Sequence, residues 1–179
     1  MLNEKDCCLI IVDVQGKLAR LMQDKVTLFK NIRILIQSAK ILNVPILWCQ
    51  QVPAALGPTA PQIAELLAGS EPINKSCFSC CLNEKFNNKL KSLGRKQILL
   101  CGIETHVCIY QTAADLLANG FEVNVVADAV SSRTLDNKQI ALKRMTVEGA
   151  KISSTEMALF EILRTADHPN FKQIAKLVK

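Results

Sequence analysis

Cys108 is the side chain of this sequence best placed for nucleophilic chemistry. It lies three residues after Thr105, which we predict to be the N-cap of a helix that continues to Asn119. The first turn of a helix presents unpaired N–H groups and a partial positive charge, and both favour a thiolate. The same N–H groups can hold the negative oxygen of a tetrahedral intermediate. The alternative is an ordinary buried thiol, since most free cysteines pack as small apolar residues.

Asp13 and Lys75 are two further ionisable residues with a possible chemical role. Asp13 directly follows the apolar run Cys7–Val12, where a carboxylate is costly unless it is paired or used. It could instead cap the helix that follows. Lys75 is expected in a loop, and lysines are mostly surface residues, so its type and position alone do not indicate a site.

The elements that must position these residues alternate between strands and helices. Apolar runs predict strands over residues 7–12, 44–49, 97–101, 122–127 and 150–153. Helical spacing predicts helices over residues 26–39, 62–68, 83–93, 105–119, 137–147, 155–163 and 170–179. This order predicts an α/β fold, a three-layer α/β/α sandwich around a mainly parallel, doubly wound, Rossmann-like sheet of about 5–6 strands. Ligands of such sheets bind beyond the carboxyl ends of the strands, where Asp13 is expected and near where Cys108 is expected.

The composition fits a single domain over residues 1–179 and argues against several classes of protein. The net charge is +6, but the basic residues are spread along the chain, which indicates a solvated surface and no nucleic-acid partner. No apolar stretch approaches the roughly 20 residues of a membrane helix, and the polar start does not resemble a signal peptide. We therefore expect a cytoplasmic protein without a membrane partner, whose eight cysteines are reduced thiols.

Short motifs along nearly the whole chain resemble the isochorismatase-like cysteine hydrolases, nearest to the small metal-free isochorismatase-domain proteins. Residues 13–15 (DVQ) resemble the opening D-x-Q of that family, and residues 75–79 (KSCFS) resemble its K-x-x-F-S segment. Residues 102–108 (GIETHVC) resemble its G-[VI]-x-T-x-x-C motif, and residues 126–133 and 149–152 match its later signatures. The order and spacing of these motifs together carry the resemblance.

The resemblance implies a hydrolase that cleaves a C–N bond, of an amide or carbamoyl group, in a small molecule. Cys108 would form a thioester, Asp13 would act as general acid and base, and Lys75 would lower the thiol pKa and support the thiolate. The resemblance also implies a cis peptide bond between Ile103 and Glu104. That bond would direct the backbone N–H groups of Glu104 and Cys108 into an oxyanion hole.

Further expectations concern the surroundings of the site. Gln15 and Phe78 are expected to contact the substrate by their position, and no cofactor is expected. The nicotinamidases of this family bind a metal through an Asp and two His in and after the loop that follows the second strand, but this region contains no histidine here, so no metal site is expected. The resemblance also implies a homo-oligomer, a dimer or larger.

Two other functions remain open from the sequence. One is a catalytically silent member of the same fold that binds a small molecule or has a regulatory role. The other is a thiol redox protein that uses Cys108 together with the cysteines of residues 77–81.

Overall fold

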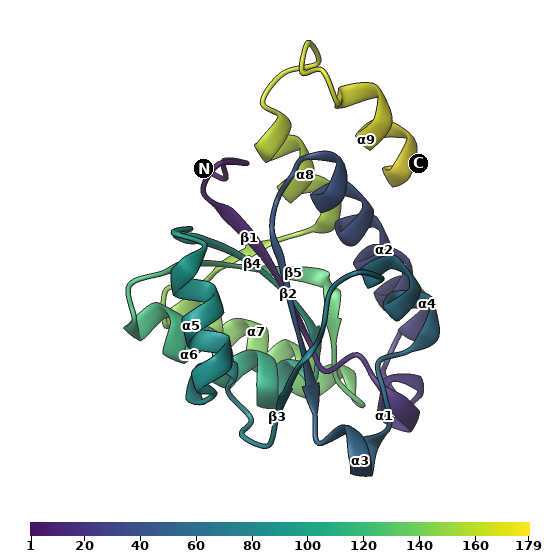
Figure 1. Ribbon diagram of the computed structural model, residues 1–179, viewed down its shortest axis with the longest axis vertical. Coiled ribbons are helices and arrows are strands. Elements are labelled where there is room, and N and C mark those ends of the chain that lie inside the picture. The colour runs from purple at the N-terminus through teal and green to yellow at the C-terminus, as the bar shows by residue number, and fades with distance from the viewer.

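A parallel six-stranded sheet forms the middle layer of the protein, whose computed structural model describes residues 1–179 (Figure 1). The strand order is β3-β2-β1-β4-β5-β6, and every neighbouring pair is parallel. The strands are β1 (Cys7–Val12), β2 (Ile46–Gln51), β3 (Ile73–Lys75), β4 (Gln97–Ile103), β5 (Glu122–Ser131) and β6 (Lys151–Ser153). The predicted doubly wound α/β fold is therefore confirmed.

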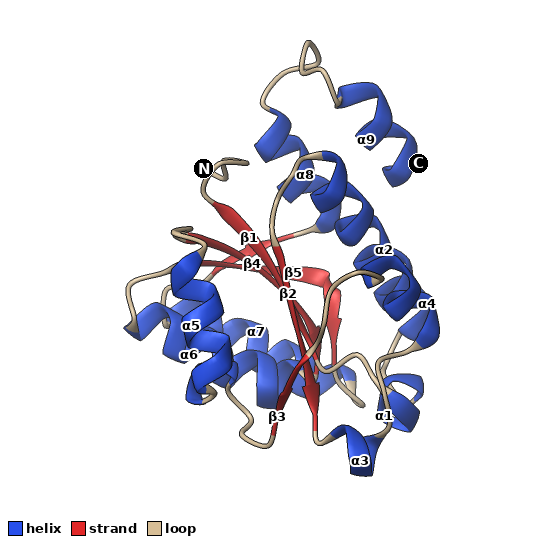
Figure 2. Ribbon diagram, in the orientation of Figure 1, coloured by secondary structure: helices blue, strands red, loops and turns tan.

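Helices cover both faces of this sheet, as Figure 2 shows. The helices are α1 (Gly16–Arg20), α2 (Lys25–Ile41), α3 (Pro53–Leu56), α4 (Pro61–Ala64), α5 (Glu84–Ser92), α6 (Tyr110–Ala118), α7 (Leu135–Val147), α8 (Thr155–Leu163) and α9 (Phe171–Val178). Helices α2, α4, α8 and α9 pack on one face, and α5, α6 and α7 pack on the other. None of the helices combines the length and apolar character needed to cross a membrane.

Strand β1 explains why the sequence shows uninterrupted apolar runs. Its side chains alternate between the two apolar layers, with Leu9 and Ile11 in one and Ile10 and Val12 in the other. Because both faces of the sheet are covered, no position of β1 faces water, and all six residues are buried. The same covering fixes the register of β1 between β2 and β4.

The chain order reverses at β1, because β2 lies on one side of it and β4 on the other. Such a switch point opens a crevice beyond the carboxyl ends of the two central strands. Gly102, near the end of β4, has a φ of +122°, and a Cβ atom there would lie 2.1 Å from the carbonyl oxygen of Val12. Only glycine allows β4 to approach β1 this closely where the crevice begins.

Two local predictions are wrong. Lys75 is the last residue of the edge strand β3 and does not lie in a loop. Three residues are too few to show a strand period in the sequence. Thr105 is not an N-cap, because Glu104 precedes the helical residues and Thr105 opens a π-helical turn, Thr105–Ile109, which continues into α6. The Thr105 hydroxyl is buried without a hydrogen-bond partner.

Candidate active site

A buried ion pair joins the ends of β1 and β3. The Nζ of Lys75 donates to Oδ2 of Asp13 at 2.6 Å, and the two side chains are 0% and 3% exposed. Nζ also donates to Oε1 of Gln51 at 2.7 Å and to the carbonyl oxygens of Cys77 and Phe78 at 3.2 and 3.1 Å. An ammonium group has only three N–H donors, so four acceptors saturate it. Lys75 is therefore held behind Asp13, with no donor left for a substrate.

Burial and mutual attraction act in opposite directions on this pair. Burial raises the pKa of Asp13, and the neighbouring Lys75 opposes the rise without cancelling it. Burial is the largest single influence on Lys75 and lowers its pKa, but the charge and hydrogen bond of Asp13, together with the nearby thiols of Cys80 and Cys108, leave the lysine pKa raised. Lys75 therefore keeps its proton, while Asp13 accepts a proton more readily than an exposed carboxylate does. That combination suits a general base.

Cys108 lies next to this base, in the π-helical turn between β4 and α6. Its residue is 7% exposed. Burial raises the pKa of the Cys108 thiol, and the charge and hydrogen bond of Asp13 raise it further, whereas Lys75 lowers it. Lys75 thus acts in the expected direction, but burial and Asp13 act more strongly, and the thiol pKa is raised overall. The sulfur therefore keeps its proton in the resting protein, close enough to the Asp13 carboxylate for that charge to raise the thiol pKa. Oδ1 of Asp13 is buried and has no hydrogen-bond partner.

A cavity of about 120 Å³ gives access to the thiol. It is lined by Asp13, Gln15, Leu18, Gln51, Leu56, Phe78, Ile103, Glu104, Val107 and Cys108. All the residues that the sequence assigned to the site line this cavity except Lys75, which contacts Asp13 from outside it. The expected substrate contacts differ in character, because Phe78 is 53% exposed and Gln15 is fully buried.

Gln15 has a structural task that its sequence position does not reveal. Its Nε2 donates to the carbonyl oxygens of Gln51 and Gly57 at 2.8 and 2.7 Å, and its Oε1 accepts from the N–H of Gln51 at 2.7 Å. The amide is therefore engaged on both sides and ties the segment after β1 to the end of β2. Its contact with a substrate is limited to the surface that it presents to the cavity.

Glu104 follows a cis peptide bond with Ile103, at the position that the resemblance implies. Its backbone N–H makes no hydrogen bond within the protein, and Glu104 is one of the residues that line the cavity. Its carboxylate accepts through Oε1 from the backbone N and the Nε of Arg133, both at 3.1 Å. The sequence motifs contain Arg133 but gave no reason to pair it with Glu104, because the two come from different strand ends.

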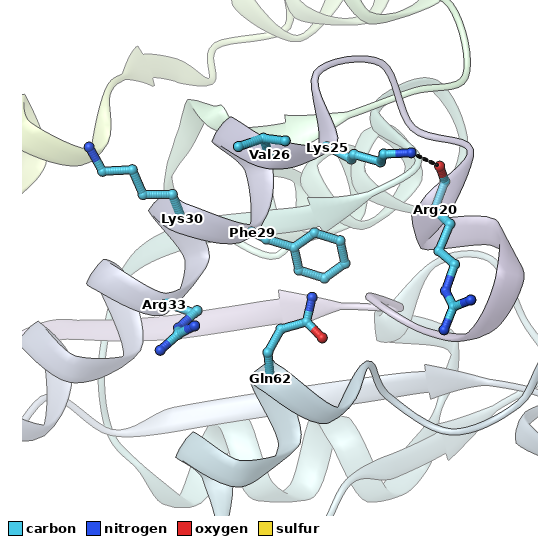
Figure 3. A pocket seen from close by; sticks show the side chains of 7 residues that line it. All are labelled: Arg20, Lys25, Val26, Phe29, Lys30, Arg33 and Gln62. Atoms are coloured by element: carbon cyan, nitrogen blue, oxygen red, sulfur yellow. Dashed lines mark hydrogen bonds between the residues drawn. The ribbon is translucent and has the colours of Figure 1, made fainter.

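A second, wider cavity lies elsewhere. It measures about 630 Å³, lies among α1, α2 and α4, and shares no lining residue with the cavity at Cys108 (Figure 3). It contains no thiol or carboxylate. No group of three or more His, Cys, Asp or Glu side chains is placed to hold a metal ion, and this includes the cysteines of residues 77–81.

Known proteins share both the sequence pattern and the fold of this chain. It matches the family model for the Isochorismatase domain over residues 7–157. Isochorismatase domain-containing protein 2 of Danio rerio is 39% identical over 178 residues, which cover 99% of this chain and 89% of that protein.

Two solved structures share the whole architecture. MAR1 ribonuclease from Caenorhabditis elegans has a TM-score of 0.93 and 36% identity, covering 99% of this chain and 91% of that one. The YcaC gene product of Escherichia coli, an octameric hydrolase of unknown specificity, has a TM-score of 0.93 and 26% identity, covering 98% of this chain and 88% of that one. The matching domain, the 39% identical relative and the shared fold together show that this chain belongs to the isochorismatase family.

Proposed function

We propose that this protein is a cysteine hydrolase that cleaves the C–N bond of a small amide or carbamoyl compound through a thioester on Cys108. The observation that carries the proposal is the buried Lys75–Asp13 pair, which lies against the thiol at the wall of one small cavity. A carboxylate beside a thiol is a base beside a nucleophile, which is the usual requirement for covalent catalysis.

The first half of the reaction forms the thioester. Asp13 accepts the Sγ proton of Cys108 while the sulfur attacks the carbonyl carbon of the substrate. The backbone N–H groups of Glu104 and Cys108 hold the oxygen that becomes negative. Asp13 then gives its proton to the leaving nitrogen, the C–N bond breaks, and an amine or ammonia departs.

The second half releases the acyl group. Asp13 accepts a proton from water as the water oxygen attacks the thioester carbon. The C–S bond breaks, and the proton returns to the sulfur of Cys108. The products are a carboxylic or carbamic acid and the resting thiol, and no oxidant or reductant is needed.

Lys75 has a positioning role in this mechanism. Its four acceptors leave it no donor for the substrate, but they fix Asp13 at the end of β1 and balance its charge. The raised pKa of Cys108 keeps the proton on the sulfur until a substrate arrives, and the raised pKa of Asp13 makes that carboxylate a better acceptor of the proton during attack. We therefore propose activation of the thiol during attack and not a resting thiolate.

The cavity favours a small substrate. Its volume of about 120 Å³ lies below the roughly 300–1,000 Å³ of pockets for drug-sized ligands, and six of its ten lining residues are hydrophobic. We expect the substrate to have a short aliphatic acyl group. A nucleotide is too large for this cavity, so we do not propose for it the ribonuclease activity that is named for the C. elegans protein. We further propose a cytoplasmic homo-oligomer that needs no metal or cofactor; the octameric E. coli relative supports the oligomer.

The proposal can be tested with p-nitrophenyl acetate, an activated acyl donor. We expect a burst of p-nitrophenol and an acetyl group on Cys108, mapped by mass spectrometry of peptides. Cys108→Ala should lose both signals, and Cys81→Ala, which removes a half-buried thiol outside the cavity, should keep them. An acetyl group found only on other residues would refute the nucleophile.

Turnover is tested next with acetamide, propionamide and isobutyramide as substrates. Ammonia release that is lost in Cys108→Ala and strongly reduced in Asp13→Asn would support the hydrolase. An acetylated Cys108 that persists without hydrolysis in the wild-type protein would instead favour the catalytically silent alternative. Loss of two hydrogens on mild oxidation, abolished by Cys80→Ser, would favour the redox alternative.

A further inference from the structure

Helix α2 has a charge pattern that the fold itself does not explain. Over Lys25–Ile41 it contains three lysines and one arginine and no acidic residue. Lys25 stands in the first turn, where the helix macrodipole favours negative charge. The preceding Asp24 makes no capping hydrogen bond with its side chain. The Asp24 carboxylate accepts from Oγ1 of Thr27 at 2.9 Å and supplies negative charge at the helix start, so Lys30 and Arg33, further along α2, are cations without an acidic residue in the helix.

Three of the four positive residues of α2, Lys25, Lys30 and Arg33, line one cavity (Figure 3). This cavity of about 630 Å³ is lined by Arg20, Lys25, Val26, Phe29, Lys30, Arg33 and Gln62. The ring of Phe29 lies in the middle of this group, with Arg20 and Arg33 on either side of it in Figure 3. Val26 is 75% exposed beside it. An apolar surface is thus flanked by two guanidinium groups that come from different helices.

The cations of this cavity have no negative partners. None of its two arginines and two lysines forms a salt bridge, and no carboxylate lines the cavity. The one polar contact among them is a hydrogen bond from Nζ of Lys25 to the carbonyl oxygen of Arg20 at 3.2 Å. Like charges gathered around one depression repel each other, and a bound anion would remove that repulsion.

We infer that this cavity binds a small organic anion with a flat apolar body. The apolar part lies on Phe29 and Val26, and its carboxylate, phosphate or sulfonate group is held by Arg20 or by Arg33, whose guanidinium groups lie on opposite sides of the Phe29 ring. Guanidinium groups bind planar or tetrahedral oxyanions through two parallel hydrogen bonds, and they also stack on flat rings. The volume lies within the usual range of roughly 300–1,000 Å³ for small-molecule sites. This site is separate from the proposed active site and does not depend on its chemistry.

Isothermal titration calorimetry with 1-naphthyl phosphate tests the inference. Inorganic phosphate and 1-naphthol, which represent the anionic and the apolar part of that ligand, are titrated separately for comparison. We expect one naphthyl phosphate per chain, bound more tightly than either half and more weakly as salt is added. Arg20→Gln or Arg33→Gln, whichever removes the guanidinium that holds the anionic group, should weaken binding about tenfold, the typical effect of losing one charged hydrogen bond. Phe29→Ala should weaken binding of naphthyl phosphate and leave inorganic phosphate unchanged.

Two controls separate this site from others. Lys143→Gln removes an exposed cation of α7 that forms no salt bridge, and it should leave binding unchanged. Cys108→Ala should also bind naphthyl phosphate normally, so failure of the proposed hydrolase would not affect this result. Equal affinity in wild type, Arg20→Gln and Arg33→Gln would overturn the inference. Tighter binding of a short RNA oligonucleotide, with the salt dependence of several phosphate contacts, would overturn it in favour of a nucleic-acid surface.

Discussion

Replacing Lys75 by methionine tests whether the ion pair at the active site also holds the fold together. Methionine has a similar length and no charge, so the substitution leaves the Asp13 carboxylate buried without its cation. Removing one partner of a buried pair typically costs about 3–5 kcal/mol of the free energy of unfolding. Lys75 and Asp13 are 0% and 3% exposed, so water cannot take the place of the ammonium without rearrangement. For a chain of this size, that cost corresponds to a fall in Tm of about 6–20 °C.

The double variant Lys75→Met with Asp13→Asn isolates the pair. Once the carboxylate is neutral, loss of the ammonium leaves no unpaired buried charge at Asp13. The double variant should therefore be more stable than the sum of the two single effects predicts, by about 0.5–3 kcal/mol. Asp13→Asn alone should cost less than Lys75→Met, because Gln51 and two carbonyl oxygens still accept from the ammonium.

The pH dependence of the Lys75→Met variant follows from the Asp13 carboxyl. Burial raises the pKa of Asp13 in the folded protein above its unfolded value of about 3.9, and loss of Lys75 removes the main opposing influence. The folded state then binds the proton more tightly than the unfolded state. Its stability therefore rises as the pH falls through the folded pKa and is lost as the pH rises through it. The cost of Lys75→Met should be larger at pH 8 than at pH 5.

The assay for these effects is urea unfolding followed by far-UV circular dichroism at both pH values. The reasoning would be refuted if Lys75→Met cost less than about 1 kcal/mol, which is the range of an exposed pair. It would equally be refuted if the two single effects simply added, since additive effects indicate residues that do not interact.

Three further outcomes follow from the site and the strand next to it. Asp13→Asn should shift the pH profile of Cys108 alkylation by iodoacetamide to lower pH, because the Asp13 charge and hydrogen bond raise the thiol pKa; an unchanged profile would contradict their contact. Glu104→Ala should lower the free energy of unfolding by about 1.5–3 kcal/mol in urea, since two donors lose a charged acceptor, and Glu104→Gln should lose less. Gly102→Ala should prevent stable folding, because the new Cβ would lie 2.1 Å from the carbonyl oxygen of Val12. Gly94→Ala is the control: Gly94 also has a positive φ but has open space around it, so this variant should fold at a cost of about 1 kcal/mol, and thermal unfolding measures both.

The sequence alone was sufficient for the fold class, and β1 shows why. A strand covered on both faces must be apolar at every position, so the run Cys7–Val12 identifies a buried parallel strand directly. Alternation of such runs with helical spacing leaves few topologies open, because parallel neighbours require crossovers. Asp13 directly follows this strand, so its position at the carboxyl edge of the sheet, where ligands of such folds bind, also follows from the sequence.

Other features depend on atoms that the chain brings together from distant positions. Only a motif pointed to Lys75 in the sequence. An edge strand of three residues shows too little pattern to be predicted, and the buried ammonium of Lys75 depends on acceptors from β2 and from the loop after β3. The overall direction of the Cys108 pKa shift could not be predicted from the sequence for a related reason. Helix position and a nearby lysine both favour a thiolate, but the enclosure of the thiol and its contact with Asp13 exist only in the folded protein.

The cavity at Cys108 and the cavity around Phe29 also show which features the sequence predicts and which depend on the tertiary structure. The residue types in the cavity at Cys108 were largely named from motifs, but its small volume is set by how the segments after β1, β2 and β4 close around it. The positive cavity was not predicted at all, because its cations are dispersed along the sequence and only the packing of α1, α2 and α4 gathers them around Phe29. Residue types determine which chemistry is possible, and distances between segments far apart in the chain decide which of it a site can perform.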